Sequence, residues 1–156
     1  MEGVNAMRIK HILLAEDNPN DVELTLAALA EQGLANHIVV VHDGAEAMEY
    51  LLCQGAYADR ISGDPSVILL DLKMPRMDGL DVLRAMENVP QLKLIPVVIL
   101  TSSREEADLV NSYQHGANAY VVKPIQFGEF MKAVRALGMF WALLNEPPPN
   151  GGMSGK

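Results

Sequence analysis

Four short apolar runs in this sequence each end at a side chain that can take part in chemistry. The runs cover residues 12–15, 67–70, 97–100 and 119–122, and they end at Glu16 with Asp17, at Asp71, at Thr101 and at Lys123. Runs that are apolar on both faces suit parallel strands covered by helices. The carboxyl ends of parallel strands meet at one edge of a sheet, where ligands bind in open α/β proteins. We therefore expect three carboxylates, a hydroxyl and an ammonium to converge there.

The three carboxylates predict a bound cation, because clustered negative charges repel one another unless a cation lies among them. Oxygen ligands with open positions suit Mg²⁺, for which Mn²⁺ can substitute. Asp71 ends a buried strand and precedes a loop rich in turn-forming residues, which leaves its carboxylate accessible as a nucleophile. Simpler interpretations also exist: Asp17 could do no more than cap a helix, and Thr101 could be an ordinary strand residue.

The pattern of the whole chain predicts five strands, each followed by a helix. The remaining strand covers residues 37–41, and the helices cover about 19–32, 44–54, 80–89, 104–115 and 126–144. Asn18 with Pro19 signals the start of the first helix, and Ser103 signals that of the fourth. Three glycines mark helix ends: Gly33, Gly55 and Gly116. We expect Cys53, in the second helix, to be a packed thiol.

The composition favours one compact cytoplasmic domain with a protein as its partner. The chain has 156 residues, of which 49% are hydrophobic, and a formal net charge of −8. Nucleic acids and anionic membranes would repel that charge, so we expect neither as a partner. No apolar segment before the acidic pair is long enough for a signal peptide or a membrane span. The expected domain covers residues 8–144, between an N-terminal arm at 1–7 and a disordered tail at 145–156.

Four motifs together resemble the receiver domain of two-component response regulators. They are LLAEDN, ILLDLKMPRMDG, VVILTSS and AYVVKP, which match that family in order and spacing. The resemblance covers residues 8–144 and implies a flavodoxin-like, doubly wound α/β fold, with five parallel strands in the order 2-1-3-4-5 and helices on both faces. It also implies that Asp71 accepts a phosphoryl group from a sensor histidine kinase in a Mg²⁺-dependent reaction. Such a protein is not an enzyme, beyond catalysing its own phosphorylation and slow autodephosphorylation.

The resemblance also assigns roles to the residues around the phosphoacceptor. The implied metal ligands are Asp17, Glu16, Asp71 and the backbone carbonyl of Lys73. The implied phosphoryl contacts are Thr101 and Lys123, the switch residues are Thr101 and Tyr120, and the residues that tune dephosphorylation are Lys73 and Ser103. The chain departs from the commonest pattern at Glu16, where most receivers have Asp. The longer side chain would reach the metal directly or act through water.

Three further segments resemble single-domain regulators that serve bacterial phytochrome histidine kinases: GAYADRISGDP, SSREEADLVNSYQHGANAYVVKP and FGEFMKAVRALGMFWALL. This resemblance implies a bacteriophytochrome as the partner and light as the input. The last helix has more apolar residues than one face against the sheet can bury, which predicts either a homodimer or a helix end folded back over the fifth strand. The expected dimer contacts are Phe127, Phe140, Trp141 and Leu144.

Several functions fit these residues. A phosphorylation switch would remodel the surface of its fourth helix, fifth strand and fifth helix for docking or dimerisation, whereas a phosphorelay shuttle or phosphate sink would have no output of its own. A phosphatase with an aspartate nucleophile would need a second Asp two residues after Asp71, where this chain has Lys73. A phosphorylation-independent docking scaffold would not need Asp71, Thr101 and Lys123 to be intact.

Overall fold

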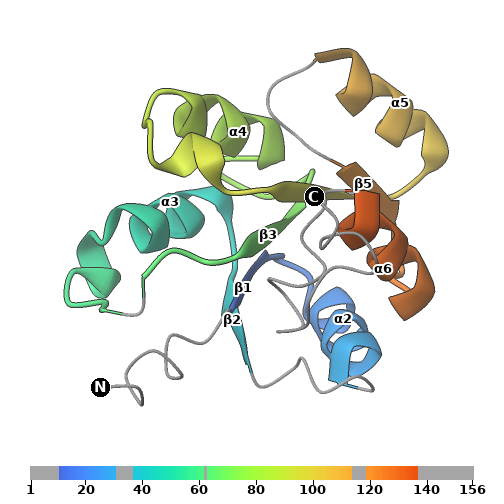
Figure 1. Ribbon diagram of the computed structural model, residues 1–156, viewed down its shortest axis with the longest axis horizontal. Coiled ribbons are helices and arrows are strands. Elements are labelled where there is room, and N and C mark those ends of the chain that lie inside the picture. The colour runs from blue at the N-terminus through green and yellow to red at the C-terminus, as the bar shows by residue number, and fades with distance from the viewer. Residues whose placement is uncertain (1–10, 31–36, 62, 114–118, 137–156) are drawn as a thin grey trace, which may run out of the picture.

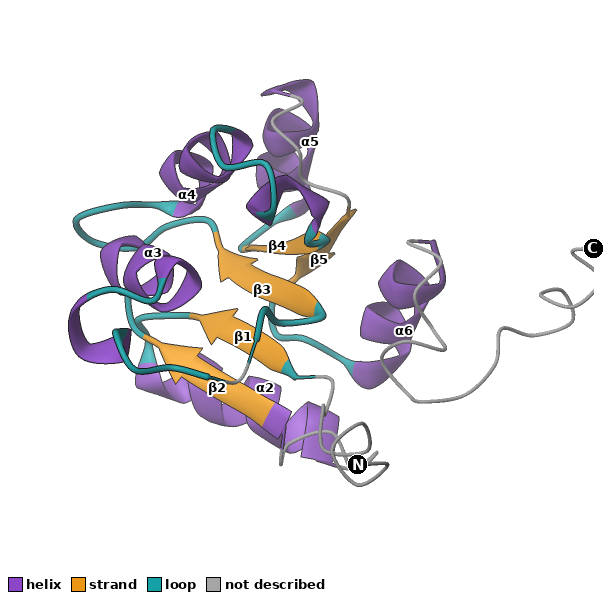
Figure 2. Ribbon diagram, turned by 60° about the vertical axis from the view of Figure 1, so that its left-hand side comes forward, coloured by secondary structure: helices purple, strands orange, loops and turns teal. Residues whose placement is uncertain are grey.

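The computed structural model describes residues 11–30, 37–61, 63–113 and 119–136, and these contain one five-stranded parallel sheet. Its strands are β1 (Ile12–Ala15), β2 (Ile38–Val41), β3 (Val67–Asp71), β4 (Val97–Thr101) and β5 (Ala119–Val122). They lie in the order β2-β1-β3-β4-β5. Figure 2 shows the strands in orange between two layers of helices. The predicted doubly wound α/β fold and its strand order are confirmed.

Helices cover both faces of the sheet. They are α2 (Pro19–Ala30), α3 (Gly44–Leu52), α4 (Gly79–Glu87), α5 (Arg104–Tyr113) and α6 (Phe127–Ala136), with two short 3₁₀ helices, η2 (Gly55–Tyr57) and η3 (Leu92–Leu94). In Figure 1, α3, α4 and α5 lie on one face, and α2 and α6 lie on the other. Alternate residues of each central strand belong to different clusters: Leu13 packs with α3 and α4, and Leu14 packs with α2 and α6. Burial on both faces therefore explains why these strands are continuously apolar.

Short polar side chains cap the helices that begin beside the site. Asn18 Oδ1 accepts a hydrogen bond from the Asp21 backbone N–H at 3.0 Å, directly before Pro19 starts α2. Asp43 Oδ1 accepts one from the Glu46 backbone N–H at 2.8 Å and caps α3. These bonds satisfy backbone donors that have no partner within the helix. The predicted start of α2 is thus confirmed.

The predicted end of the second helix is wrong by about two residues. The helix α3 ends at Leu52, and Cys53 follows in the left-handed conformation with φ 56°. The backbone N–H of Gln54 donates to Glu49 O at 2.9 Å, which closes the helix before Gly55. This turn directs Cys53 outward, so its thiol is exposed rather than packed. The expected helix ends at Gly33 and Gly116 lie outside the described residues.

The loop after β3 is held against the start of two helices. The Gly44 backbone N–H donates to Met77 O at 3.0 Å, and the Arg76 guanidinium pairs with the Asp43 carboxylate. A Cβ atom at Gly79 would lie 2.6 Å from Asp71 O, a distance that no side chain can occupy. Glycine is therefore required where α4 begins, since the chain passes directly over the backbone of the predicted nucleophile.

Within the residues described, no helix combines the length and the apolar composition needed to cross a lipid bilayer.

Candidate functional site

The carboxyl edge of the sheet brings the predicted site residues together. Parallel register pairs Ala15 with Leu70 and Asp71 with Leu100, so Glu16 and Asp17 follow β1 directly beside the end of β3. At the other side of β4, Thr101 pairs with Val122, and Lys123 is the next residue. The four apolar runs therefore deliver their polar ends to neighbouring positions, as the sequence predicts. The Lys123–Pro124 peptide bond is cis.

Three carboxylates form a compact cluster at this edge. Glu16, Asp17 and Asp71 each offer an oxygen atom, and these atoms all lie within 4.8 Å of one another. The exposed fraction is 0% for Glu16 and 4% for Asp71, whereas Asp17 is exposed. The cluster therefore has two buried acids and one acid that faces solvent.

Lys123 is the cation that the structure places against this cluster. Its Nζ lies 3.2 Å from Glu16 Oε1 and 3.2 Å from Asp71 Oδ1. It lies closer still, at 2.8 Å, to Asp21 Oδ2 in the first turn of α2. Only 15% of the Lys123 side chain is exposed, so these contacts are poorly screened by solvent.

The pKa values of these groups reflect burial and an excess of negative charge. Burial and the charge of Asp71 raise the pKa of Glu16 to about 7. Burial raises the pKa of Asp71 as well, against the opposing effects of Glu16 and Lys123. For Lys123, burial favours the neutral amine, but the hydrogen bond to Asp21 and the charges of Asp71 and Glu16 outweigh it and raise the pKa. One ammonium does not neutralise the three carboxylates.

The donor set fits a divalent cation that prefers oxygen ligands. Carboxylate oxygens from Glu16, Asp17 and Asp71 are close enough to share one ion, and such an ion would offset the charge repulsion that, after burial, helps to raise the Glu16 pKa. Because the Asp17 carboxylate is exposed, the cluster is open to solvent on that side. Histidine and cysteine, which favour softer metals, are absent from this cluster.

The Thr101 hydroxyl is buried at the same edge without a hydrogen-bond partner. Its exposed fraction is 0%, and Oγ1 makes no hydrogen bond to any residue that the structure describes. An unsatisfied buried hydroxyl destabilises a fold by about 1–3 kcal/mol, and here it leaves the Thr101 hydroxyl available to donate to a group that binds at this edge.

The residues expected to tune dephosphorylation lie on the loops around the cluster. The Lys73 ammonium is 2.9 Å from Glu106 Oε2, and its side chain is 77% exposed. Ser103 Oγ accepts a hydrogen bond from the Glu106 backbone N–H at 3.2 Å and thereby caps α5. The loops after β3 and β4 are thus joined through Glu106.

The remaining predicted residues are the switch residue Tyr120 and the expected dimer contacts. Tyr120 is half-buried in β5 and packs against the cluster that contains Leu13. Phe127 begins α6, but its side chain is outside the description, as are the expected dimer residues Phe140, Trp141 and Leu144.

Two acidic residues of the site were missed by the sequence analysis. Asp21 pairs with Lys123, and Glu106 pairs with Lys73. Both lie in the first turn of a helix, where the positive end of the helix dipole already explains an acidic side chain. Their position next to a strand end that carries a reactive group was the signal that could have indicated a second role.

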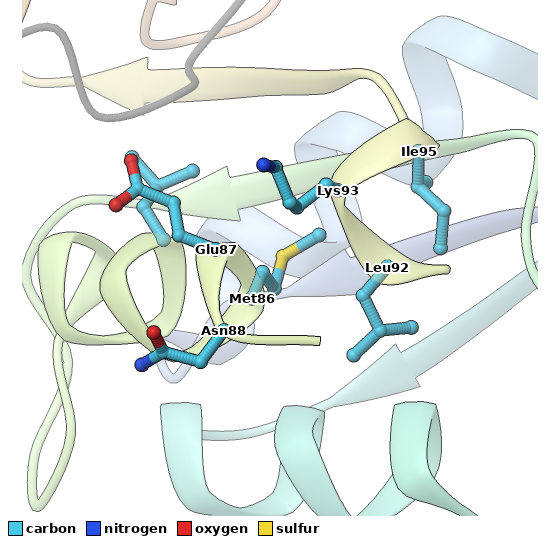
Figure 3. A pocket seen from close by; sticks show the side chains of 7 residues that line it. Met86, Glu87, Asn88, Leu92, Lys93 and Ile95 are labelled. Carbon is cyan, nitrogen blue, oxygen red and sulfur yellow. The ribbon is translucent and has the colours of Figure 1, made fainter. Parts of the chain in front are cut away.

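A pocket of about 320 Å³ lies away from this edge. Figure 3 shows its lining, which comes from the end of α4 and from η3 and includes Met86, Leu92 and Ile95. Because η3 directly precedes β4, the pocket lies near the amino edge of the sheet and contains none of the acidic cluster.

Comparison with known proteins identifies the family. The sequence profile of the response regulator receiver domain matches residues 12–135. The structure of the bacteriophytochrome response regulator AtBRR is similar with a TM-score of 0.82 and 58% sequence identity, over 88% of this chain and 99% of that chain. The structure of the bacteriophytochrome response regulator RtBRR is similar with a TM-score of 0.81 and 53% identity, over 94% of this chain and 88% of that chain.

A third relative is the response regulator Rcp1 from Synechocystis sp., which is 38% identical over 132 residues, covering 85% of this chain and 88% of Rcp1. A solved structure of Rcp1 is its Mn²⁺-bound form, which matches with a TM-score of 0.68 and 37% identity over 90% of this chain and 99% of that chain. The profile match, the fold and the acidic edge agree with one another. The chain belongs to the response regulator receiver domain family.

Proposed function

We propose that this protein is a response regulator that accepts a phosphoryl group on Asp71 from a sensor histidine kinase. The observation that carries the proposal is the unpaired, buried hydroxyl of Thr101 at the edge where Lys123 contacts Asp71. A phosphoryl group on Asp71 would bring strong acceptor oxygens to this edge. The Thr101 hydroxyl and the Lys123 ammonium are the donors that such oxygens need.

The residues of the site would act mainly by positioning and by charge. Phosphoryl transfer passes through a loose transition state, so charge neutralisation contributes more than covalent chemistry from other side chains. The Asp71 carboxylate attacks the phosphorus as the bond between phosphorus and the imidazole nitrogen of the kinase's phosphohistidine breaks, and the imidazole leaves with the electron pair of that bond. Lys123 balances the negative charge of the phosphoryl group that arrives. Asp17, Asp71, Glu16 and the Lys73 carbonyl would hold Mg²⁺, which would supply further positive charge, and the Mn²⁺-bound form of Rcp1 supports a divalent ion at this edge.

Phosphorylation would then change the surface of α5, β5 and α6. Thr101 ends β4 directly before α5, so a hydrogen bond from its hydroxyl to the phosphoryl group would draw that loop inward. Tyr120, half-buried on the neighbouring strand, would turn into the space that opens. Lys73 and Ser103 would set the access of water to the phosphorylated carboxylate and hence the lifetime of the signal.

A bacteriophytochrome is the proposed kinase, and light is the proposed input. Two similar structures are those of bacteriophytochrome response regulators, at 58% and 53% identity. The proposed location is the cytoplasm, where the kinase domain of such a receptor would meet its regulator.

Acetyl phosphate tests the acceptor chemistry without a kinase. With Mg²⁺ present, the protein should gain one acid-stable, base-labile phosphate, as expected for an acyl phosphate. EDTA should prevent the gain, since the free acidic cluster repels an incoming phosphoryl group. A phosphate that survives base, or that forms equally well in EDTA, would point to a different acceptor.

We also propose a homodimer through the last helix. Phe130 and Met131 of α6 are buried against the sheet, while Glu129 and Lys132 on the opposite side are exposed. The outward face of α6 is therefore charged over its described residues. The apolar residues that one face against the sheet would not bury come later in the sequence, at Phe140, Trp141 and Leu144.

Sedimentation velocity should show a dimer that Phe140→Glu weakens, because a carboxylate would be buried at the contact. Lys132→Glu, on the charged face, is the matched control and should leave the dimer in place. A monomer at tens of micromolar, with and without phosphorylation, would contradict dimerisation.

A further inference from the structure

Among the residues that the structure describes, the Lys123 ammonium has one carboxylate partner outside the acidic cluster, Asp21. Nζ lies 2.8 Å from Asp21 Oδ2, compared with 3.2 Å from Glu16 Oε1 and 3.2 Å from Asp71 Oδ1. Asp21 is not one of the residues whose oxygens can share a cation with Asp71. The ion pair that Asp21 forms at this edge is with Lys123.

The position of Asp21 is fixed by the start of α2. Its backbone N–H donates to Asn18 Oδ1 at 3.0 Å, and Pro19 restricts the first helical residue. The Asp21 side chain is only 28% exposed. The backbone of Asp21 is thus fixed beside the site, and its short side chain reaches Lys123 from there.

We propose that Asp21 is a positioning residue of the phosphorylation switch: it holds the Lys123 ammonium in the unphosphorylated protein and competes for it with the phosphoryl group on Asp71. The inference rests on the proposed function. An ammonium donates at most three hydrogen bonds; Lys123 Nζ donates to Glu16 and Asp21 and forms an ion pair with Asp71, so three carboxylates already surround it. A phosphoryl oxygen can become a partner of Lys123 only when one of these contacts is released.

Asp21 is the partner that resists this release most. A divalent ion shared by Glu16, Asp17 and Asp71 would neutralise those carboxylates and weaken their attraction for Lys123. Asp21 lies outside that group, so the ion would not weaken its attraction for Lys123 in the same way. The Asp21 contact therefore opposes capture of the phosphoryl group and favours the unphosphorylated arrangement of the loop before α6.

Charge-matched variants can measure this competition in the full-length protein. Asp21→Asn removes the charge and keeps the shape, and Asp21→Glu restores the charge. Glu23→Gln is the control, because it makes the same charge change on an exposed residue of the same helix that does not contact Lys123. The readouts are the initial rate of phosphorylation by acetyl phosphate and the affinity for beryllofluoride, a phosphoryl analogue, followed by ¹⁹F NMR with Mg²⁺ present.

We expect Asp21→Asn to raise both the rate and the affinity roughly fivefold, the upper end for an ion pair that still contacts solvent. Asp21→Glu should return both values toward wild type, and Glu23→Gln should change them less than about twofold. In a Lys123→Ala background the effect of Asp21→Asn should disappear, because Asp21 acts through that ammonium.

An equal effect of Asp21→Asn and Glu23→Gln, or an undiminished effect without Lys123, would overturn the inference alone. A wild-type protein that takes up neither phosphate nor beryllofluoride would overturn the proposed function, and the inference with it.

Discussion

Asp71→Asn is expected to abolish phosphorylation by acetyl phosphate and by a histidine kinase. The amide nitrogen and oxygen of asparagine are poor nucleophiles, and Asp71 is the acid that contacts the Lys123 ammonium from β3, the strand paired with the one that ends at Thr101. The loss should be complete within detection, measured as radiolabel or as intact mass. The fold should persist, since Asn can keep the hydrogen bonds of a buried carboxylate while removing its charge.

Asp59→Asn is the matched control for this variant. Asp59 is exposed in the segment between α3 and β3 and is not part of the acidic cluster, so the same chemical change there should leave phosphorylation unaltered. Label that persists undiminished in the Asp71 variant would show that another residue is the acceptor.

Lys123→Ala should separate cation binding from signal transmission. The acidic cluster loses the ammonium that partly neutralises it, so its attraction for Mg²⁺ should stay the same or increase, as measured by isothermal titration. The phosphorylated variant should nevertheless fail to change its α5, β5 and α6 surface, because the phosphoryl group has lost its charged partner. Thr101→Ala should behave similarly through loss of the hydroxyl.

Asp17→Ala should have the opposite effect on Mg²⁺ binding in the same isothermal titration. It removes an exposed carboxylate of the cluster and should weaken Mg²⁺ binding by at least about tenfold, the smallest loss usual even for a residue that only supports a metal ligand. If Lys123→Ala lost Mg²⁺ affinity while Asp17→Ala kept it, the roles of these two residues would be reversed.

The convergence of the site was predictable from the sequence because one physical rule fixes it. Each of Glu16, Asp71, Thr101 and Lys123 lies at the end of an apolar run, and parallel pairing aligns such ends whatever the details of the helices. Thr101 shows the limit of this rule. Its place at the edge followed from the sequence, but the absence of a partner for its hydroxyl depends on the packing around it.

Contacts between elements could not be predicted in the same way. The pairs Asp21 with Lys123 and Glu106 with Lys73 join a helix start to a loop that is distant in sequence. Their formation depends on how each helix lies across the sheet, which periodicity does not specify. A first-turn acid also has a sufficient local explanation in the helix dipole, so the sequence offers no reason to seek a second partner.

The prediction of where α3 ends was wrong for a related reason. Gly55 has the positive φ that a glycine permits, and a glycine at this position predicts that the helix ends there. The chain had already turned at Cys53, where backbone hydrogen bonds to the last turn outweigh the cost of a left-handed non-glycine residue. The preference of glycine for helix ends does not reveal whether such hydrogen bonds can hold a cysteine in the left-handed conformation.

Chemical trapping of the acceptor tests phosphorylation at Asp71 most directly. Borohydride reduces an acyl phosphate to an alcohol, so it converts a phosphorylated aspartate into homoserine, which peptide mass spectrometry can locate. After incubation with acetyl phosphate and Mg²⁺, we expect homoserine at position 71, and none when EDTA is present. Homoserine at another position, or an unreduced Asp71 in protein that has taken up phosphate, would contradict acceptance of the phosphoryl group by Asp71.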